Sequence, residues 1–166
     1  MLHVLYIQAF LTEPGVTAVD KVNGNFPPWL ERRDGLQIPH GARDLLYDDV
    51  PPELAEKAAS LVVPNSLNLT ESSISYVPWH DMLCTYVICE NDKTVPPEVA
   101  RWLIASCGMK CDVVRLQSGH SPFLSMPART AAVVRYVSGE KGVDLEGVEF
   151  GETGEGKMKE GWVRDE

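Results

Sequence analysis

Two residues of this sequence, an aspartate and a histidine, have types and positions suited to proton transfer. His120 lies within residues 118–123 (SGHSPF), directly after an apolar stretch typical of a strand. Asp92 precedes it by 28 positions, within residues 90–96 (ENDKTVP), and follows another such stretch. An imidazole that moves protons needs a carboxylate to fix its tautomer and to stabilise the imidazolium. The spacing therefore predicts an acid–base pair on the loops that follow two neighbouring strands.

Both residues also have a structural interpretation. Asn91-Asp92 suits a turn, and backbone groups can satisfy the ring of a histidine on a loop. A hydrolytic triad would need a third member, a serine or cysteine on a strand–turn–helix elbow such as Gly-x-Ser-x-Gly, ahead of both residues. This sequence contains no such elbow. The pattern alone leaves the catalytic and the structural interpretation open.

The elements that must position this pair alternate between strands and helices. Apolar runs at 2–11, 84–89 and 112–116 predict three strands, and prolines near 51, 96 and 127 begin helices. Such alternation predicts a parallel sheet, with functional side chains beyond the carboxyl ends of its strands. We expect an α/β fold of about three strands with flanking helices. Residues 16–39 have no sustained period and are expected to be mostly loop, and 143–150 is a weaker candidate for a fourth strand.

The charge distribution separates a body from an acidic tail. The 166 residues suffice for one domain with a core, and the formal net charge is −9. From Gly139 onward, nine acidic residues face four basic ones among many glycines, so residues 139–166 are predicted to be a disordered tail. The negative charge argues against nucleic acid or an anionic membrane as a partner. No apolar run reaches the length of a membrane span.

The cysteines and acidic residues give no metal pattern. Cys84, Cys89, Cys107 and Cys111 lack zinc spacing and are expected to be free thiols in a reducing compartment. The first residues lack the features of a secretion signal, so a cytoplasmic location is expected. The acidic run at 44–49 could bind a cation, but such side chains are usually solvated. We expect no metal and no cofactor.

Residues 85–136 resemble the C-terminal part of the α/β-hydrolase fold, in the branch of plant methylesterases, hydroxynitrile lyases and their microbial relatives. The likeness rests on the acid strand at 86–96 (YVICENDKTVP) and on the histidine loop at 118–127 (SGHSPFLSMP). The strand at 4–10 is similar to the one that follows the nucleophile helix. Residues 47–49 and the helix from 51 to 63 are similar to part of the small cap. The likeness covers roughly residues 2–137.

The resemblance implies a partial α/β-hydrolase domain over residues 1–138, with an incomplete parallel sheet and a partial cap at about 16–80. It implies that Asp92 is the triad acid and His120 the general base in the hydrolysis of a small ester or related acyl substrate. Phe123, Leu124 and Trp79 are candidates to line the substrate pocket. The family's elbow and part of its oxyanion hole lie upstream of the strand that begins here at residue 2. We therefore expect a truncated form, or a shortened gene model, and little or no esterase activity from the isolated chain.

Other functions remain open from the sequence. A lyase or isomerase could use His120 and Asp92 for proton transfer without a nucleophile. The chain could also be a real short product that acts as a non-catalytic fragment or binding module. The strand at 2–11 would leave an open sheet edge in a shortened sheet, so self-association is a further expectation.

Overall fold

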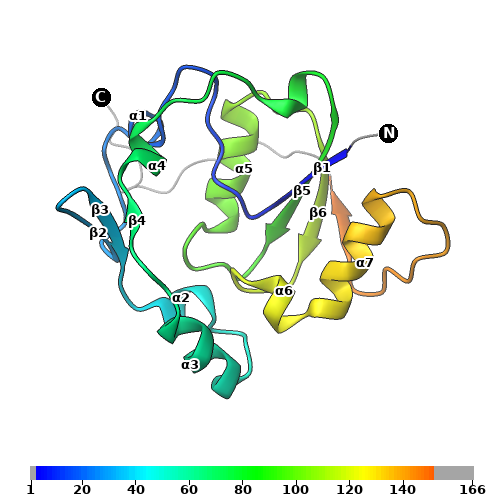
Figure 1. Cartoon of the computed structure of the whole chain (residues 1–166). Helices are drawn as coiled ribbons and strands as arrows, with labels where there is room; N and C mark the ends of the chain where they lie inside the picture. Colours follow the sequence, from blue (N-terminus) through cyan, green and yellow to red (C-terminus); the bar gives the residue numbers. More distant parts are fainter. Residues whose placement is uncertain (1–2, 152–166) are drawn as a thin grey trace.

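The computed structural model describes residues 3–151; residues 1–2 and 152–166 are not described (Figure 1). Fifteen elements follow one another along these residues. In order they are β1 (His3–Ile7), α1 (Ala18–Lys21), β2 (Leu30–Arg33), β3 (Leu36–Pro39), α2 (Ala42–Leu46), α3 (Pro52–Ser60), β4 (Asn65–Ser66), α4 (Asn68–Glu71), η1 (Pro78–His80), β5 (Leu83–Cys89), α5 (Pro97–Ser106), β6 (Asp112–Leu116), α6 (Pro122–Ser125), α7 (Pro127–Val137) and β7 (Glu149–Gly151).

The main sheet has the strand order β1-β5-β6-β7. β5 pairs in parallel with β1 on one side and with β6 on the other, and β7 pairs antiparallel to β6. The three parallel strands are the three that the apolar runs predicted, which confirms the α/β class. Because β5 lies between β1 and β6, the loop after β5 sits at the middle of the sheet's carboxyl edge.

Side chains of β5 alternate between two apolar clusters on opposite faces of the sheet. Tyr86 and Ile88 pack with buried residues of α5, including Leu103, in the larger cluster. Val87 packs with Val133 of α7 in the smaller one. The two helices therefore cover opposite faces of the sheet (Figure 1). Six of the seven residues of β5 are buried, so this strand is a rigid support for the loop that follows it.

Residues 139–151, which the sequence placed in a disordered tail, instead return to the sheet. After α7 the chain turns back and β7 joins β6, where Arg115 Nη2 lies 2.5 Å from Glu149 Oε2. The Phe150 ring packs edge-on against Tyr136 of α7 at 5.3 Å between centroids. Together with the strand pairing, this ion pair and this aromatic contact hold β7 in place, within a segment predicted to be disordered apart from the weaker strand candidate at 143–150. Residues 152–166 of the expected tail lie outside the described residues.

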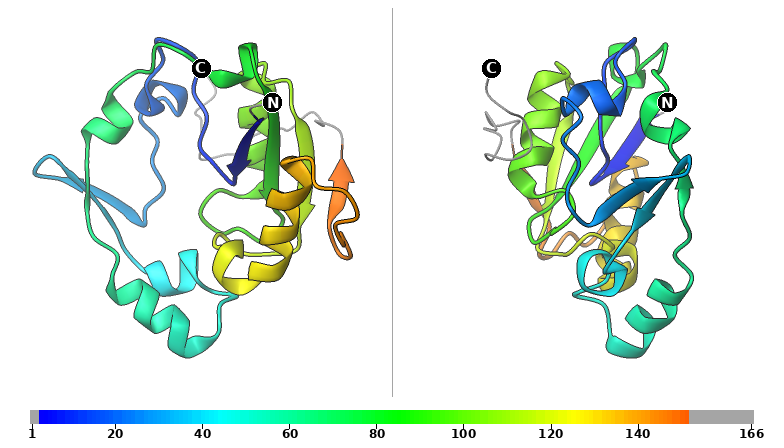
Figure 2. Two further views of the ribbon diagram at one scale, coloured as in Figure 1. Left: turned by 45° about the vertical axis from the view of Figure 1, so that its right-hand side comes forward. Right: turned by 90° about the vertical axis from the view of Figure 1, so that its left-hand side faces the viewer.

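Residues 18–80 lie beside the main sheet, in the region predicted as a cap, and we call this segment the cap (Figure 2). Its β2–β3 hairpin turns at Asp34 and Gly35, whose φ angles of 52° and 77° suit the tight turn that Asp-Gly favours. β4 extends this hairpin to three antiparallel strands. The hairpin occupies part of the region that the sequence predicted as loop, and its Asp-Gly turn is a signal that could have identified it.

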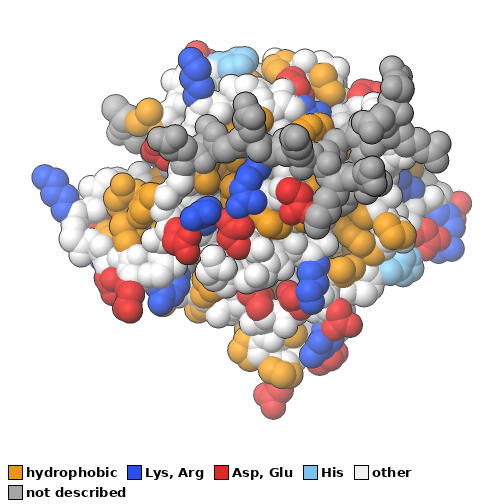
Figure 3. Space-filling model, turned by 180° about the vertical axis from the view of Figure 1, so that it is seen from behind, with side chains coloured by type: hydrophobic (Ala, Val, Ile, Leu, Met, Phe, Trp, Pro, Cys, Tyr) orange, Lys and Arg blue, Asp and Glu red, His pale blue; other side chains and the backbone are white. Residues whose placement is uncertain are grey.

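The surface of the described residues carries charges of both signs. On the face that Figure 3 shows, basic side chains lie among acidic ones rather than in one continuous basic patch. Among residues 3–151, no helix combines the length and apolar character needed to cross a membrane.

Candidate active site

The two loops that carry Asp92 and His120 leave the sheet side by side. β5 and β6 are paired up to Cys89 and Leu116. Two further backbone hydrogen bonds continue this pairing into the loops, from Glu90 N to the Leu116 carbonyl (2.9 Å) and from Asn91 N to the Ser118 carbonyl (3.0 Å). This extension fixes the separation of the loops just before the two functional side chains.

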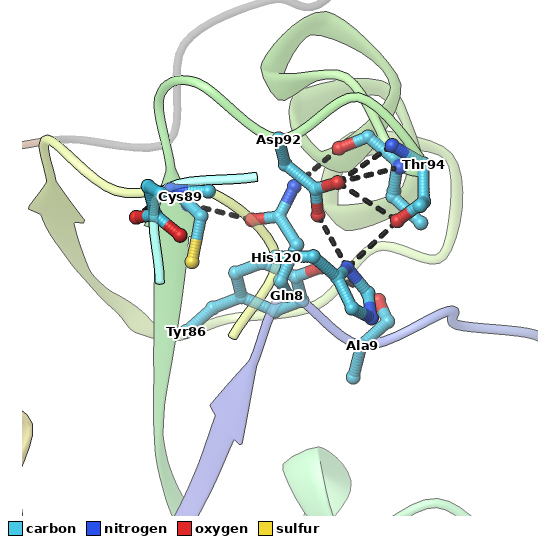
Figure 4. Close-up of polar contacts among 10 residues, drawn as sticks. Gln8, Ala9, Tyr86, Cys89, Asp92, Thr94 and His120 are labelled. Carbon is cyan, nitrogen blue, oxygen red and sulfur yellow. Dashed lines mark hydrogen bonds and ion pairs between the residues drawn. The ribbon is translucent and has the colours of Figure 1, made fainter. Parts of the chain in front are cut away.

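The structure brings Asp92 and His120 into direct contact. His120 Nδ1 lies 2.7 Å from Asp92 Oδ2 (Figure 4). The Asp92 side chain is fully buried, whereas 29% of the His120 side chain is exposed. A buried carboxylate can orient the imidazole, and the exposed part of the ring can meet another molecule.

The other oxygen of Asp92 is held by the turn that follows it. Asp92 Oδ1 accepts hydrogen bonds from Thr94 N (2.7 Å), Thr94 Oγ1 (2.8 Å) and Val95 N (3.2 Å). With the contact to His120, both carboxylate oxygens are satisfied despite burial. The carboxylate is therefore fixed in the orientation in which Oδ2 faces the imidazole. Asp92 is the turn residue that its dipeptide suggested and also the partner of His120.

Thr94 contacts both members of the pair, and sequence analysis missed it. Its Oγ1 lies 2.7 Å from His120 Nδ1 while its proton is donated to Asp92 Oδ1. The hydroxyl can therefore only accept from the ring, so the Nδ1 proton is shared between the Thr94 hydroxyl and Asp92 Oδ2. This places the hydrogen of a neutral imidazole on Nδ1. Nε2 has no hydrogen-bond partner among residues 3–151, and its lone pair is free to accept a proton.

Gln8 connects the end of β1 to the acid loop. It is buried and has a φ of 42°, a left-handed conformation that is uncommon for a residue other than glycine. Its Oε1 accepts from Cys89 N at 2.6 Å, and its Nε2 donates to the Val95 carbonyl (Figure 4). A polar residue at the end of an apolar strand was the one sequence signal for this role.

The cysteines do not provide an activated nucleophile. Burial raises the pKa of Cys89 to about 12, and it raises the pKa values of Cys107 and Cys111 to about 11 from an ordinary 9. Burial also raises the pKa of Cys84. Because the thiolate is the reactive form, these thiols stay protonated and unreactive at neutral pH.

A cavity of about 490 Å³ lies between the cap and the sheet, and none of its lining residues is charged. Thr94 and Val95 of the acid loop form part of its wall, which connects it to the pair. Trp79, one of the predicted pocket residues, lines it and packs edge-on against Tyr6. Phe123 is 54% exposed, and neither it nor Leu124 belongs to this lining. Six aromatic side chains line the cavity: Tyr6, Phe10, Phe26, Trp29, Tyr76 and Trp79.

Comparison with known proteins places this fold in context. Residues 2–133 match the sequence model of the alpha/beta hydrolase family. The alpha/beta hydrolase nvfD of Aspergillus novofumigatus is 28% identical over 84% of this chain and 58% of its own length. A pyrethroid hydrolase from Sphingobium faniae superposes with a TM-score of 0.68 at 21% identity, over 82% of this chain and 60% of that one. The Arabidopsis methylesterase MES16 gives a TM-score of 0.62 at 17% identity, over 82% of this chain and 58% of that one.

These matches confirm the resemblance to the α/β-hydrolase fold and to plant methylesterases. They also show that this chain spans about 60% of the length of the relatives it matches.

Proposed function

Because this chain belongs to the alpha/beta hydrolase family, we propose that His120 and Asp92 are the base and acid of a Ser-His-Asp triad that hydrolyses an ester or related acyl substrate. The observation that carries the proposal is the 2.7 Å contact between His120 Nδ1 and Asp92 Oδ2, with no hydrogen-bond partner for Nε2 within residues 3–151. Nε2 takes the proton from the attacking hydroxyl and returns it to the leaving group. Asp92 holds the ring and stabilises the imidazolium formed between these steps.

The nucleophile belongs to a segment outside this sequence. The sequence has no Gly-x-Ser-x-Gly elbow, and the buried thiols are protonated. A general base alone supplies roughly 10²- to 10⁴-fold of an acceleration that usually exceeds about 10⁶-fold. The 166-residue chain by itself therefore has little or no esterase activity.

The substrate is a small ester with an uncharged, bulky apolar or aromatic group. The cavity beside Thr94 has the volume for such a group and carries no charged residue in its wall. Trp79 forms part of that wall. Phe123 and Leu124, which follow His120 and lie outside the cavity, contact the portion of the substrate that extends from it.

The proposed reaction needs no metal and no cofactor, since the triad supplies both nucleophile activation and proton transfer. The four free thiols suit a reducing compartment, so the protein acts in the cytoplasm. β1 is an edge strand that pairs only with β5 among the described residues. Its free edge is where a further strand, or a second copy of the chain, would add to the sheet.

Complementation tests the proposal. This chain is co-expressed with the part of alpha/beta hydrolase nvfD that it does not match, and hydrolysis of p-nitrophenyl acetate and p-nitrophenyl benzoate is measured. Activity is expected only when both parts are present, with a loss of about 10²-fold or more in His120→Ala and Asp92→Asn. A Glu53→Gln variant, which changes an exposed carboxylate of the cap, serves as control. Hydrolysis that survives His120→Ala, or that the chain alone performs, contradicts the proposal.

A further inference from the structure

A short cap segment between α2 and α3 binds both loops of the proposed site. Asp49 Oδ2 accepts a hydrogen bond from Gly119 N at 2.6 Å. Asp48 Oδ2 forms an ion pair with Lys93 Nζ at 2.8 Å. Gly119 directly precedes His120, and Lys93 directly follows Asp92. Two adjacent cap residues thus bind the immediate neighbours of the base and of the acid.

The two contacts differ in strength. The Lys93 side chain is more than half exposed, and ion pairs at exposed sites contribute little. The contact of Asp49 is partly buried and joins a backbone N–H to a carboxylate, a charge-assisted bond about twice as strong as a neutral one. Asp49 therefore provides the stronger of the two restraints, on the loop of His120. Asp48 adds a weaker restraint on the loop of Asp92.

Close packing at Gly119 shows how tightly the cap segment fits the base loop. A Cβ atom added at this position would lie 2.5 Å from Asp48 Oδ1 and 2.8 Å from Asp49 Oδ1. No side chain fits there unless the two carboxylates move away. The glycine before His120 is thus required by the approach of the cap and not by its own backbone dihedral angles.

The cap segment is itself anchored, so it can hold the loop in place. Val50, next to Asp49, is buried, and its backbone N–H donates to the Tyr47 carbonyl at 3.2 Å. Ala55, in the helix that follows, is fully buried. A carboxylate on a packed segment restrains its partner more than one on a free loop does.

We propose that Asp49, assisted by Asp48, is a positioning residue that couples the cap to His120 and sets the contact of its ring with Asp92. This inference rests on the proposed function only in calling His120 the base. The coupling between the cap and the two loops does not depend on that function. Asp48 and Asp49, the last two acids of the run at 44–49, thus form a clamp: one binds the loop of His120 and the other the loop of Asp92.

Hydrogen exchange and ring NMR of the full chain test the coupling without any need for activity. Asp49→Ala is expected to speed exchange of the Gly119 amide hydrogen by roughly tenfold or more, because the amide loses its hydrogen bond to a charged acceptor. It is also expected to shift and broaden the His120 ring resonances. Asp49→Asn, whose amide oxygen still accepts a hydrogen bond, should change both much less. Glu53→Gln, an exposed cap acid without a role in the clamp, should change neither.

A second pair of variants tests the close approach itself. Gly119→Ala should perturb the His120 ring in the otherwise unchanged chain. It should perturb the ring much less in an Asp48→Ala/Asp49→Ala background, where the obstructing carboxylates are gone.

The coupling is overturned if Asp49→Ala leaves Gly119 exchange within twofold of the original chain, or if exchange rises while the His120 ring stays unchanged. Should Asp49→Ala fail to fold, Gly119→Ala in the otherwise unchanged chain decides. A His120 ring whose resonances stay unchanged in that variant would overturn the coupling. A failed complementation assay with a positive NMR result would refute the proposed function while leaving the coupling intact.

Discussion

Replacing Thr94 by valine removes the hydroxyl that contacts both Asp92 and His120 and nearly preserves the side chain's shape. The hydroxyl donates to a fully buried carboxylate at 2.8 Å, and a hydrogen bond to a charged group contributes about 1.5–3 kcal/mol. Asp92 Oδ1 keeps its two backbone donors, so the loop should persist. We therefore expect Thr94→Val to lower the free energy of unfolding by about 1.5–3 kcal/mol.

This loss is large enough to measure. For a chain of this length, 1 kcal/mol corresponds to roughly 2–4 °C in Tm, so a decrease of about 3–12 °C is expected. Urea unfolding followed by tryptophan fluorescence gives the free energy directly, with an unchanged dependence on urea concentration. Thr94→Ser, which keeps the hydroxyl, should recover most of the loss.

Thr130→Val is the matched control. Thr130 is also a buried threonine, but its hydroxyl donates to the neutral Met126 carbonyl at 3.2 Å, and that carbonyl already accepts from the backbone of Thr130. This substitution should cost less than about 1 kcal/mol. If Thr94→Val costs no more than the control, the hydroxyl does not hold the carboxylate, and our account of how the pair is oriented is refuted.

The remaining predictions concern the link from β1 and the buried thiols. Gln8→Leu would leave Cys89 N and the Val95 carbonyl without their side-chain partner. We therefore expect urea unfolding to show a free energy of unfolding lower by about 2 kcal/mol or more, and an unchanged midpoint would contradict the link between β1 and the acid loop. In the folded chain at pH 8, thiols with a pKa near 11 carry about a hundredfold less thiolate than a thiol of pKa 9. Because a thiolate of higher pKa is the better nucleophile, they should react with a disulfide reagent roughly tenfold or more slowly, and reaction at the ordinary rate would contradict burial. Because folding raises these pKa values, the unfolded thiols lose their protons first, and stability should fall as pH rises above about 9; a flat profile between pH 8 and 10.5 would count against the shifts.

The sequence was sufficient to predict the contact between Asp92 and His120, because the order of the strands brings their loops together. Asp92 and His120 come after successive parallel strands, whose carboxyl ends meet at one edge of the sheet, so the pairing followed from the order of elements. Thr94 lies two residues from Asp92, but its residue type did not indicate a contact with His120.

Contacts between distant segments were beyond such reasoning. Gln8 bonds to Cys89 across 81 positions and Asp49 to Gly119 across 70, and both depend on how the cap and β1 approach the loops. β7 overlaps the end of the weaker strand candidate at 143–150, but its partners could not be predicted, since Glu149 pairs with Arg115 of β6 and Phe150 packs against Tyr136 of α7. Local patterns could not reveal partners that only the folded chain brings together.

The protonation pattern of His120 is the most direct test of the proposed base. Long-range ¹H–¹⁵N spectra of the histidine-labelled chain at about pH 8, assigned with a His120→Gln variant, report which ring nitrogen carries the proton. We predict a proton on Nδ1, shared with Asp92 and Thr94, and an unprotonated Nε2. In Asp92→Asn the new amide can donate to Nδ1, so the ring proton should move to Nε2. A neutral His120 with its proton on Nε2 in the unaltered chain would contradict the assignment of this residue as the base.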